Sequence, residues 1–422
     1  MAHKLTNVFD KYLMSSKIAI AVSGGLDSMV LMNLAKLSNK INTKNIHIVV
    51  VDHGLRKDSK EEALFVKEEA NKIGLRSQIL IWKGKKPTTK IQETARKKRY
   101  DMLFKYCKKN SISDLFVAHH LDDQIENFIF RMFRGSGIKG LTSFSNFYKI
   151  DGINLIRPLI EIPKSDLLAF AKKQKIKWVE DVSNSNFAFD RIKIRNALGN
   201  FYENGFDKKL FLKSINKLKS INEDLDFITD DYVSKYIEVH ENIYVSIKKE
   251  FFDNSPKEIQ MRVIKNCISF FAPEKLYSPK DVKMINILKW IKNNRKIDSK
   301  TLGGTLFKKN KNAILLYKEV NKLSNIKPVT ISTSEFKCWD NRFLIKSNTK
   351  INGKISYLGS KGVKILKSKE IDLNKAKKDA PIAAIYSSPA VWQKKRLISA
   401  PIFNYSNNDS VNIEIKKIGY MI

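Results

Sequence analysis

A glycine-rich turn near the start of the chain has the residue types of a phosphate-binding loop. The apolar run at 18–22 predicts a short buried strand. The residues that follow it read Ser23-Gly24-Gly25-Leu26-Asp27-Ser28. Two adjacent glycines permit a tight turn, and the spaced apolar residues from Met29 onward predict a helix. Because a helix N-terminus offers free N–H groups and a positive dipole end, we predict that residues 23–28 bind phosphate.

This loop differs from the common phosphate loop, in which a lysine follows the glycines and reaches the terminal phosphates. It resembles the loop of the N-type ATP pyrophosphatases, which split ATP into AMP and pyrophosphate. The resemblance implies ATP as the nucleotide. Asp27 would then help to hold Mg²⁺, because Mg²⁺ is usually bound through one or two carboxylates together with phosphate oxygens.

Histidines and carboxylates gather in a second stretch further along the chain. It reads Ala118-His119-His120-Leu121-Asp122-Asp123-Gln124-Ile125-Glu126-Asn127. If a helix begins at Asp122, then Asp123, Glu126 and Asn127 share one face. Two carboxylates there suit a metal ion or an ammonium group, and His119 is suited to accept a proton at neutral pH. The alternative is a helix with acids in its first turn, which accounts for Asp122 better than for the whole cluster.

Strand and helix signals alternate around these two stretches. The β-rich runs at 46–51, 78–82 and 114–118 are separated by helical patterns at 59–73 and 91–109. This alternation predicts an α/β fold with a parallel, doubly wound sheet covered by helices. Ligands bind beyond the carboxyl ends of the strands in such sheets. The residues expected to meet there are Ser23, Asp52-His53 and His119-His120.

The charge of the chain indicates a polyanionic partner. The formal net charge is +35, and nucleic acid is the usual partner of so basic a chain. A compositional bias towards lysine is the alternative, because only 13 of the 78 basic residues are arginine. Nine of those 13 lie in the first 195 residues, where planar guanidinium groups would serve recognition.

The three cysteines (Cys107, Cys267 and Cys338) are far apart and form no zinc or disulfide pattern. No secretory signal and no apolar run long enough to cross a bilayer is found in the sequence. These features predict a cytoplasmic protein.

Two further parts follow the first 200 residues. Apolar residues keep helical spacing over 211–232, and 307–317 reads as a small strand pair. From residue 331 the pattern alternates, with strands expected at 342–346, 382–386 and 396–405. We therefore predict a catalytic domain over 1–200, a mainly helical domain over 205–325 and a small β-rich domain over 331–422. The helical part is either an RNA-docking module or a spacer.

Taken together, the motifs resemble the tRNA(Ile)-lysidine synthetase family. Besides the two stretches above, the matching segments are Val51–Arg56, Gln92–Arg96, Arg99-Tyr100, Arg134–Gly137, Gly140-Leu141, Arg157–Leu159 and Asp181–Asn184. Arg191–Arg195 matches more loosely, because the family usually has Asn after the first Arg. The resemblance covers the first 200 residues well and the remainder weakly.

The resemblance implies an ATP-dependent ligase that acts on tRNA(Ile) with a CAU anticodon and on free L-lysine. The C2 oxygen of the wobble cytidine would be adenylated, and the lysine ε-amine would then displace AMP. The product, lysidine, would change the codon read from AUG to AUA. The C-terminal domain would bind the acceptor end of the tRNA. A homodimer is compatible with the resemblance, and the sequence does not determine the oligomeric state.

The site residues expected from these arguments fall into three groups. The catalytic group is Asp27, Arg99, His119, Asp123 and Glu126, with Asp27 also as the Mg²⁺ ligand. The ATP-binding group is Ser23, Gly24, Gly25, Leu26, Asp27, Ser28 and His53, and the tRNA-binding group is Arg134, Arg191 and Arg195. Arg99 would contact the α-phosphate or the lysine carboxylate, or it belongs to a solvated basic run.

Other function classes are open on sequence grounds. A tRNA 2-thiolation enzyme with the same ATP loop needs reactive cysteines or an iron–sulfur cluster, which the scattered cysteines disfavour. An NAD or GMP synthetase fits so basic a chain poorly. A nucleic-acid-binding module without catalysis leaves the phosphate loop unexplained.

Overall fold

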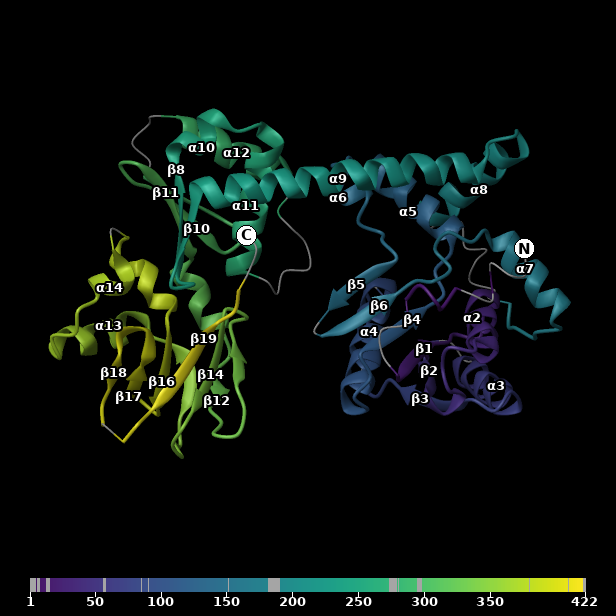
Figure 1. Ribbon diagram of the computed structural model, residues 1–422, viewed down its shortest axis with the longest axis horizontal. Helices are drawn as coiled ribbons and strands as arrows, with labels where there is room; N and C mark the ends of the chain where they lie inside the picture. Colours follow the sequence, from purple (N-terminus) through teal and green to yellow (C-terminus); the bar gives the residue numbers. More distant parts are fainter. Residues whose placement is uncertain are drawn as a thin grey trace. The chain divides into compact units, whose positions relative to one another are not determined.

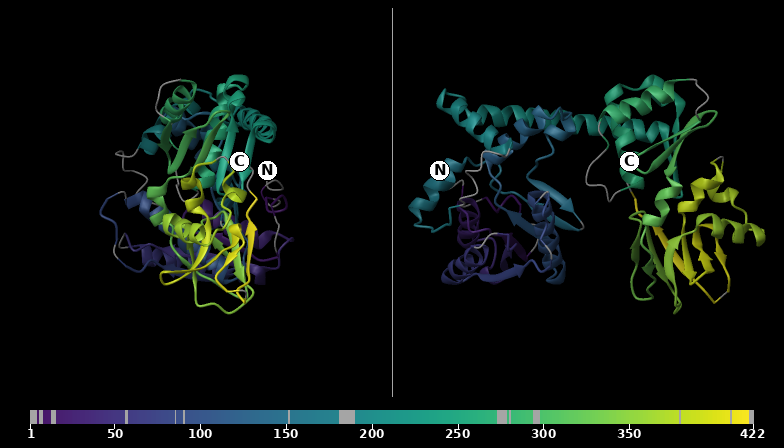
Figure 2. Two further views of the ribbon diagram at one scale, coloured as in Figure 1. Left: turned by 90° about the vertical axis from the view of Figure 1, so that its left-hand side faces the viewer. Right: turned by 180° about the vertical axis from the view of Figure 1, so that it is seen from behind.

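The computed structural model describes residues 5, 8–12, 16–55, 58–84, 86–89, 91–150, 152–180, 190–272, 279, 281–293, 298–378, 380–408 and 410–419. The chain divides into two compact units, Met1–Asn222 and Glu223–Ile422. The boundary falls within α9 (Lys208–Tyr236), which is one long helix (Figures 1 and 2). The helical spacing over 211–232 predicted this helix.

The first unit contains a six-stranded sheet in the order β3-β2-β1-β4-β6-β5 (Figure 1). Its strands are β1 (Ile18–Ala21), β2 (Ile46–Asp52), β3 (Arg76–Ile81), β4 (Asp114–Val117), β5 (Phe147–Ile150) and β6 (Ile153–Ile156). All neighbouring pairs are parallel except β5 and β6, which are antiparallel. The predicted doubly wound α/β sheet is therefore confirmed, with an antiparallel edge strand in addition.

Helices connect and cover these strands. They are α2 (Leu26–Leu37), α3 (Ser59–Lys72), α4 (Ile91–Lys109), α5 (Leu121–Phe133), α6 (Ile138–Leu141), α7 (Lys164–Lys173) and α8 (Asp190–Glu203). The strands and helices expected from the sequence lie where the patterns placed them, with small shifts at their ends.

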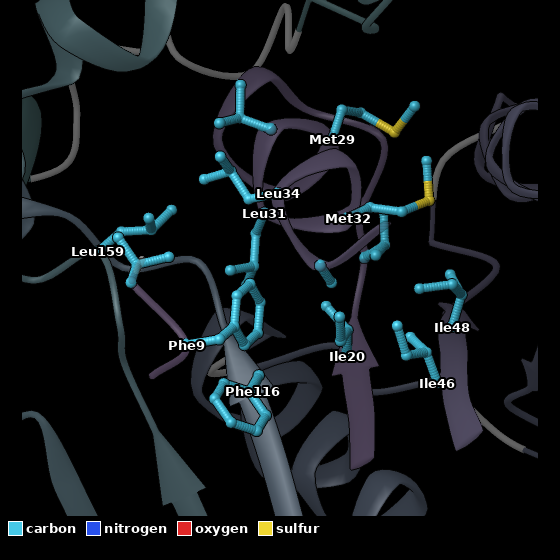
Figure 3. Close-up of a cluster of buried hydrophobic side chains, with 14 of the residues drawn as sticks. Phe9, Ile20, Met29, Leu31, Met32, Leu34, Ile46, Ile48, Phe116 and Leu159 are labelled. Atoms are coloured by element: carbon cyan, nitrogen blue, oxygen red, sulfur yellow. The ribbon is translucent and has the colours of Figure 1, made fainter. Parts of the chain in front are cut away.

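The sheet is buried on both faces, and alternate residues of each strand point to different cores. Ile18 and Ile20 of β1 belong to one hydrophobic cluster, whereas Ala19 between them belongs to another. Figure 3 shows the first cluster, in which strand residues such as Ile20 and Phe116 face the apolar side chains of α2. Because both faces are covered, the strands read as continuous apolar runs in the sequence.

The strand order determines where a ligand can bind. From β1 the chain continues outward through β2 and β3, and it then returns to place β4 on the other side of β1. The crevice at such a reversal lies beyond the carboxyl ends of the two central strands. Here those ends lead into the glycine-rich loop after β1 and the histidine pair after β4.

The second unit begins with helices and an antiparallel sheet. The sheet has the order β7-β8-β11-β10-β9. Its strands are β7 (Ile237–His240), β8 (Tyr244–Lys248), β9 (Ser299–Leu302), β10 (Thr305–Lys309) and β11 (Ala313–Lys318), and the helices are α10 (Lys249–Asn254), α11 (Lys257–Phe271) and α12 (Asp281–Lys292). The strand pair expected at 307–317 is confirmed as β10 and β11, whereas the β7–β8 hairpin was not predicted.

The remainder of the second unit is β-rich, as predicted. One sheet has the order β12-β15-β16-β17-β18 and another β13-β14-β19. The elements are β12 (Val329–Thr330), β13 (Lys337–Trp339), β14 (Phe343–Ser347), β15 (Lys354–Tyr357), α13 (Gly359–Ser368), α14 (Asn374–Lys377), β16 (Pro389–Gln393), β17 (Arg396–Ala400), β18 (Tyr405–Ser406) and β19 (Ile413–Lys417).

Two strand predictions in this part are corrected by the structure. The single strand expected at 396–405 is divided, because the 3-10 helix Pro401–Phe403 separates β17 from β18. The segment expected to be a strand at 382–386 forms a 3-10 helix, Ile382–Ser387, that begins after Pro381. Its buried residues are Ala384, Ile385 and Ser387, a spacing that a short helix produces as readily as a strand. The three-part division of the chain stays a prediction, and one core cluster holds both Tyr317 of β11 and Trp339 of β13.

A buried arginine links the segments of this second unit. The Arg342 side chain is fully buried, and its Nε donates to Asp340 Oδ2 at 2.9 Å. Its Nη1 donates to the Asn242 carbonyl at 2.8 Å and its Nη2 to the Ser387 carbonyl at 3.1 Å. Lys318 also donates to Asp340. A buried charge lowers the stability of the fold unless it is paired. The buried Arg342 guanidinium is therefore stable only when these partners are all in place.

We predict that Arg342→Ala lowers the free energy of unfolding by about 3–5 kcal/mol, because it leaves two buried carbonyls without their donor and removes one of the two cations paired with the buried Asp340 carboxylate. Chemical denaturation followed by circular dichroism measures the change. Arg396→Ala is the matched control, because Arg396 is exposed and its replacement should change stability by no more than about 0.5 kcal/mol. Equal stability of the two variants would contradict the role assigned to Arg342.

Candidate active site

The glycine-rich loop after β1 needs glycine for steric reasons. Gly24 has a φ of +90°, a conformation that residues with a side chain rarely adopt. A Cβ at this position would lie 3.4 Å from Val66 Cγ2. The Gly24 carbonyl accepts a hydrogen bond from Val179 N at 2.9 Å, so a segment distant in sequence also holds the loop in place.

Ser28 braces the loop from within. Its buried hydroxyl donates to the Gly25 carbonyl at 2.9 Å and accepts from Ser23 N at 3.1 Å. Gly25 is the N-cap of α2, so Leu26 and Asp27 lie in the first turn, where N–H groups have no partner within the helix. The loop therefore has the shape and the donors that a phosphate needs.

Asp27 and His120 join the two central loops across the reversal in strand order. Asp27 Oδ2 lies 3.4 Å from His120 Nε2. Burial lowers the pKa of His120, but the hydrogen bond to Asp27 and the carboxylates of Asp123, Asp27 and Asp122 outweigh this effect and raise it above its usual value. The sequence predicted that His120 lies in this crevice beside His119, but it gave His120 no catalytic or binding role.

His120 is also the N-cap of α5. Its Nδ1 accepts from Asp123 N at 3.4 Å, and its own N–H donates to Asp123 Oδ2 at 3.1 Å, which forms a capping box. Asp122 accepts from Lys164 N at 2.9 Å and from the Lys208 ammonium. The capped-helix alternative therefore describes part of this stretch, with a histidine as the cap.

A pocket opens beside this capped helix end. Its lining residues are Arg96, His119, Asp123, Glu126, Asn127 and Phe144. The structure thus brings Asp123, Glu126 and Asn127 together on one face of α5, as their spacing predicted. Asn127 Nδ2 is buried and has no hydrogen-bond partner among the described residues. The two carboxylates and the one guanidinium of this lining complement the charges at the two ends of an amino acid.

Glu126 is paired with an arginine from α8. Arg195 Nε and Nη2 donate to the two Glu126 oxygens at 2.6 and 2.9 Å, a bidentate arrangement. This hydrogen bond raises the pKa of Arg195 further above its usual value. Arg195 was expected to contact tRNA, and the structure places its guanidinium on the pocket carboxylate. The backbone of Arg191 lies in the same helix, and its side chain is outside the described residues.

The other predicted residues lie outside the pocket lining. Arg99 is exposed, with its guanidinium carbon 5.7 Å from the Tyr100 ring centroid. Arg96, one turn earlier in α4, lines the pocket instead, and the Gln92–Arg96 motif was the sequence signal for it. Arg134 is exposed at the end of α5, over the Phe130 ring. His53 follows β2, and its carbonyl accepts from Lys86 Nζ at 2.6 Å.

The cysteines offer no thiolate for sulfur chemistry. Burial raises the pKa of Cys107 to about 12 and that of Cys267 to about 12. Cys338 lies on the surface, and its partial removal from water raises the pKa of its thiol. The nucleophile in thiol chemistry is the thiolate, so these groups are poorly suited to a 2-thiolation reaction.

None of the helices in the described part of the chain is long and apolar enough to cross a bilayer.

Comparison with known proteins identifies the family of the first unit. A model of the PP-loop domain family matches residues 1–201. Among solved structures, the U34-tRNA thiolase NcsA from Methanococcus maripaludis, with its [4Fe-4S] cluster, aligns at 19% identity and a TM-score of 0.45. The alignment covers 53% of this chain and 79% of that protein.

Curated relatives match over the whole chain. The tRNA(Ile)-lysidine synthase of Wolbachia pipientis wMel is 31% identical over 412 residues, which are 96% of this chain and 93% of the relative. The tRNA(Ile)-lysidine synthase of Rickettsia typhi is 31% identical over 405 residues, or 95% of this chain and 92% of the relative. With its PP-loop domain and this full-length similarity, the chain belongs to the tRNA(Ile)-lysidine synthase family.

Proposed function

We propose that this enzyme joins free L-lysine to C2 of the wobble cytidine in tRNA(Ile) with a CAU anticodon. The observation that carries the proposal is the 3.4 Å contact between Asp27 and His120, which brings the phosphate loop next to the acidic pocket. ATP and an amino acid could therefore react in one crevice. The full-length relatives are tRNA(Ile)-lysidine synthases by name, and the +35 charge suits an RNA substrate.

The first step would be adenylation of the tRNA. The cytidine C2 oxygen attacks the α-phosphorus of ATP, and the bond to the β-phosphate oxygen breaks, so pyrophosphate leaves with that electron pair. Residues 23–28 would hold the phosphates through backbone N–H groups. Asp27 Oδ1 is buried and has no hydrogen-bond partner among the described residues, which fits a ligand position for Mg²⁺. A bound Mg²⁺ would supply charge neutralisation at the departing pyrophosphate.

The second step would be attack by lysine. The deprotonated ε-amine forms a bond to C2, the C2–O bond breaks, and AMP leaves with the oxygen. Asp123 and Glu126 would bind the ammonium, and one of these two carboxylates would take up the proton that it loses. Arg96 would bind the lysine carboxylate. The Arg195 guanidinium is hydrogen-bonded to the Glu126 carboxylate in this structure. The lysine ammonium would therefore replace the Arg195 guanidinium at that carboxylate. Such an exchange avoids leaving a buried charge unpaired.

The remaining assignments concern residues outside the pocket lining. Arg99, Arg134 and Arg191 would serve the nucleotide or the tRNA at the edges of the site, and His53 would lie beside the nucleotide. A cytoplasmic location and a homodimer stay predictions.

Asp27→Asn should reduce ATP–pyrophosphate exchange by at least about 100-fold, because it removes the carboxylate charge beside the phosphates. Exchange is measured with the full chain in the presence of tRNA, and circular dichroism checks the fold. Asp10→Asn is the control, since Asp10 is exposed and remote from the loop in sequence. Normal exchange by the Asp27 variant would refute the proposed role in holding Mg²⁺.

Glu126→Gln and Asp123→Asn should each raise the KM for lysine by about 10- to 100-fold, since a hydrogen bond to a charged group contributes about 1.5–3 kcal/mol. The rate of tRNA adenylation should fall much less. Incorporation of labelled lysine and release of pyrophosphate report the two quantities separately. Glu161→Gln, at an exposed position, controls for the loss of a negative charge. If adenylation falls while the lysine KM is unchanged, the residue serves the nucleotide instead.

Binding of tRNA should weaken steeply with salt, by roughly 10³-fold between about 50 and 200 mM if about six phosphates are neutralised. Filter-binding titrations of the full chain at several salt concentrations give the slope. The affinity for ATP, measured in parallel, should change far less because fewer phosphates are contacted. A flat salt dependence for tRNA would show that the basic charge does not bind its backbone.

A further inference from the structure

His119 lines the pocket, and one of its two ring nitrogens is already engaged. Arg157 Nε donates a hydrogen bond to His119 Nδ1 at 3.2 Å. The Nε of arginine always carries a proton, so Nδ1 must be the unprotonated, accepting nitrogen. A neutral ring then carries its one proton on Nε2. No partner for Nε2 is found among the described residues.

Arg157 is itself held rigidly. It follows β6, is 5% exposed, and donates from Nη1 to the Ser145 carbonyl at 2.8 Å. Its guanidinium carbon lies 4.7 Å from the Phe144 ring centroid and 5.3 Å from that of Tyr148. The Phe144 ring also meets the His119 ring edge to face at 5.3 Å. Arg157 and His119 therefore both pack against the Phe144 ring.

The charges around His119 keep its ring neutral. Burial lowers its pKa well below the usual value, and Arg157 after β6, Arg96 and Arg99 on α4, and the neighbouring His120 lower it further. Asp123 and Glu126 of α5 face the same pocket. His120 shows the opposite shift because it faces the Asp27 carboxylate. The pKa values of the two adjacent histidines are thus shifted in opposite directions.

We propose that Arg157 is a positioning residue that fixes His119 as a neutral Nε2–H donor to a substrate oxygen in this pocket. In this role His119 does not accept the proton of lysine. The identity of the substrate rests on the proposed function, in which the oxygens nearest to the reacting carbon are the cytidine C2 oxygen and the phosphate oxygens of AMP. A donor held in place before the reaction stabilises the charge that develops on such an oxygen.

The tautomer can be measured without activity. The full chain contains six histidines, so ring ¹⁵N NMR of histidine-labelled protein is tractable, and a His119→Gln variant assigns the signal. We expect the Nε2–H form, and His119 should stay neutral at the pH where an ordinary histidine titrates. An Nδ1–H signal, or titration near the ordinary histidine value, would overturn the proposal.

Variants of Arg157 test the positioning role. Arg157→Met removes the donor and should give a mixture of both tautomers, whereas Arg157→Lys keeps an N–H donor and should retain the Nε2–H form. Circular dichroism checks that each variant folds. If Arg157→Met is unfolded, the wild-type spectrum and the Lys variant still decide the matter. An unchanged tautomer in a folded Arg157→Met protein would contradict the proposal.

Variants of His119 separate a donor from a base. Glutamine offers an amide N–H near the Nε2 position but cannot accept a proton. His119→Gln should therefore stay within about 10-fold of the wild-type rate, whereas His119→Leu should lose about 100-fold or more. Equal loss in both would indicate a base. If wild-type enzyme labels no tRNA with lysine, the proposed function fails, and the NMR result still tests the tautomer.

Discussion

The contact between Asp27 and His120 is the constraint on which the active site depends. It joins the phosphate loop after β1 to the helix after β4, and those parallel strands are neighbours because the strand order reverses at β1. His120 also caps α5 through Asp123. One buried side chain therefore fixes the start of the pocket helix and its distance from the nucleotide loop. A buried charged group requires such partners, so the two loops stabilise each other.

The two adjacent histidines show how environment divides similar groups. His120 faces carboxylates and is the more basic, whereas His119 faces guanidinium groups and stays neutral. Groups whose pKa values are pushed apart in this way often have separate chemical tasks. Here one histidine joins structural elements and the other presents a donor to the pocket. The carboxylates also differ in their surroundings. Asp122 accepts hydrogen bonds from the Lys164 backbone N–H and the Lys208 ammonium, whereas Asp123 and Glu126 line the pocket.

The second unit shows a different use of buried charge. Arg342 is fully buried and bonds to backbone carbonyls from segments far apart in sequence, Asn242 and Ser387. Its guanidinium carbon lies 5.3 Å from the Phe343 ring centroid and 5.7 Å from that of Phe271. Phe343 belongs to the core cluster that holds Tyr317 of β11 and Trp339 of β13. The network holds the middle strands and the C-terminal sheets of this unit in one arrangement.

The sequence alone determined the phosphate loop, the doubly wound sheet and the shared face of Asp123 and Glu126, because glycine spacing and the periods of strands and helices are local properties. The same local reasoning gave a strand at 382–386, where a 3-10 helix with similar apolar spacing forms. Only the tertiary structure decided that Arg96 rather than Arg99 lines the pocket, that Arg195 pairs with Glu126, and that Arg157 bonds to His119. These pairings join residues from separate elements, so they depend on how the elements pack, which no local pattern records.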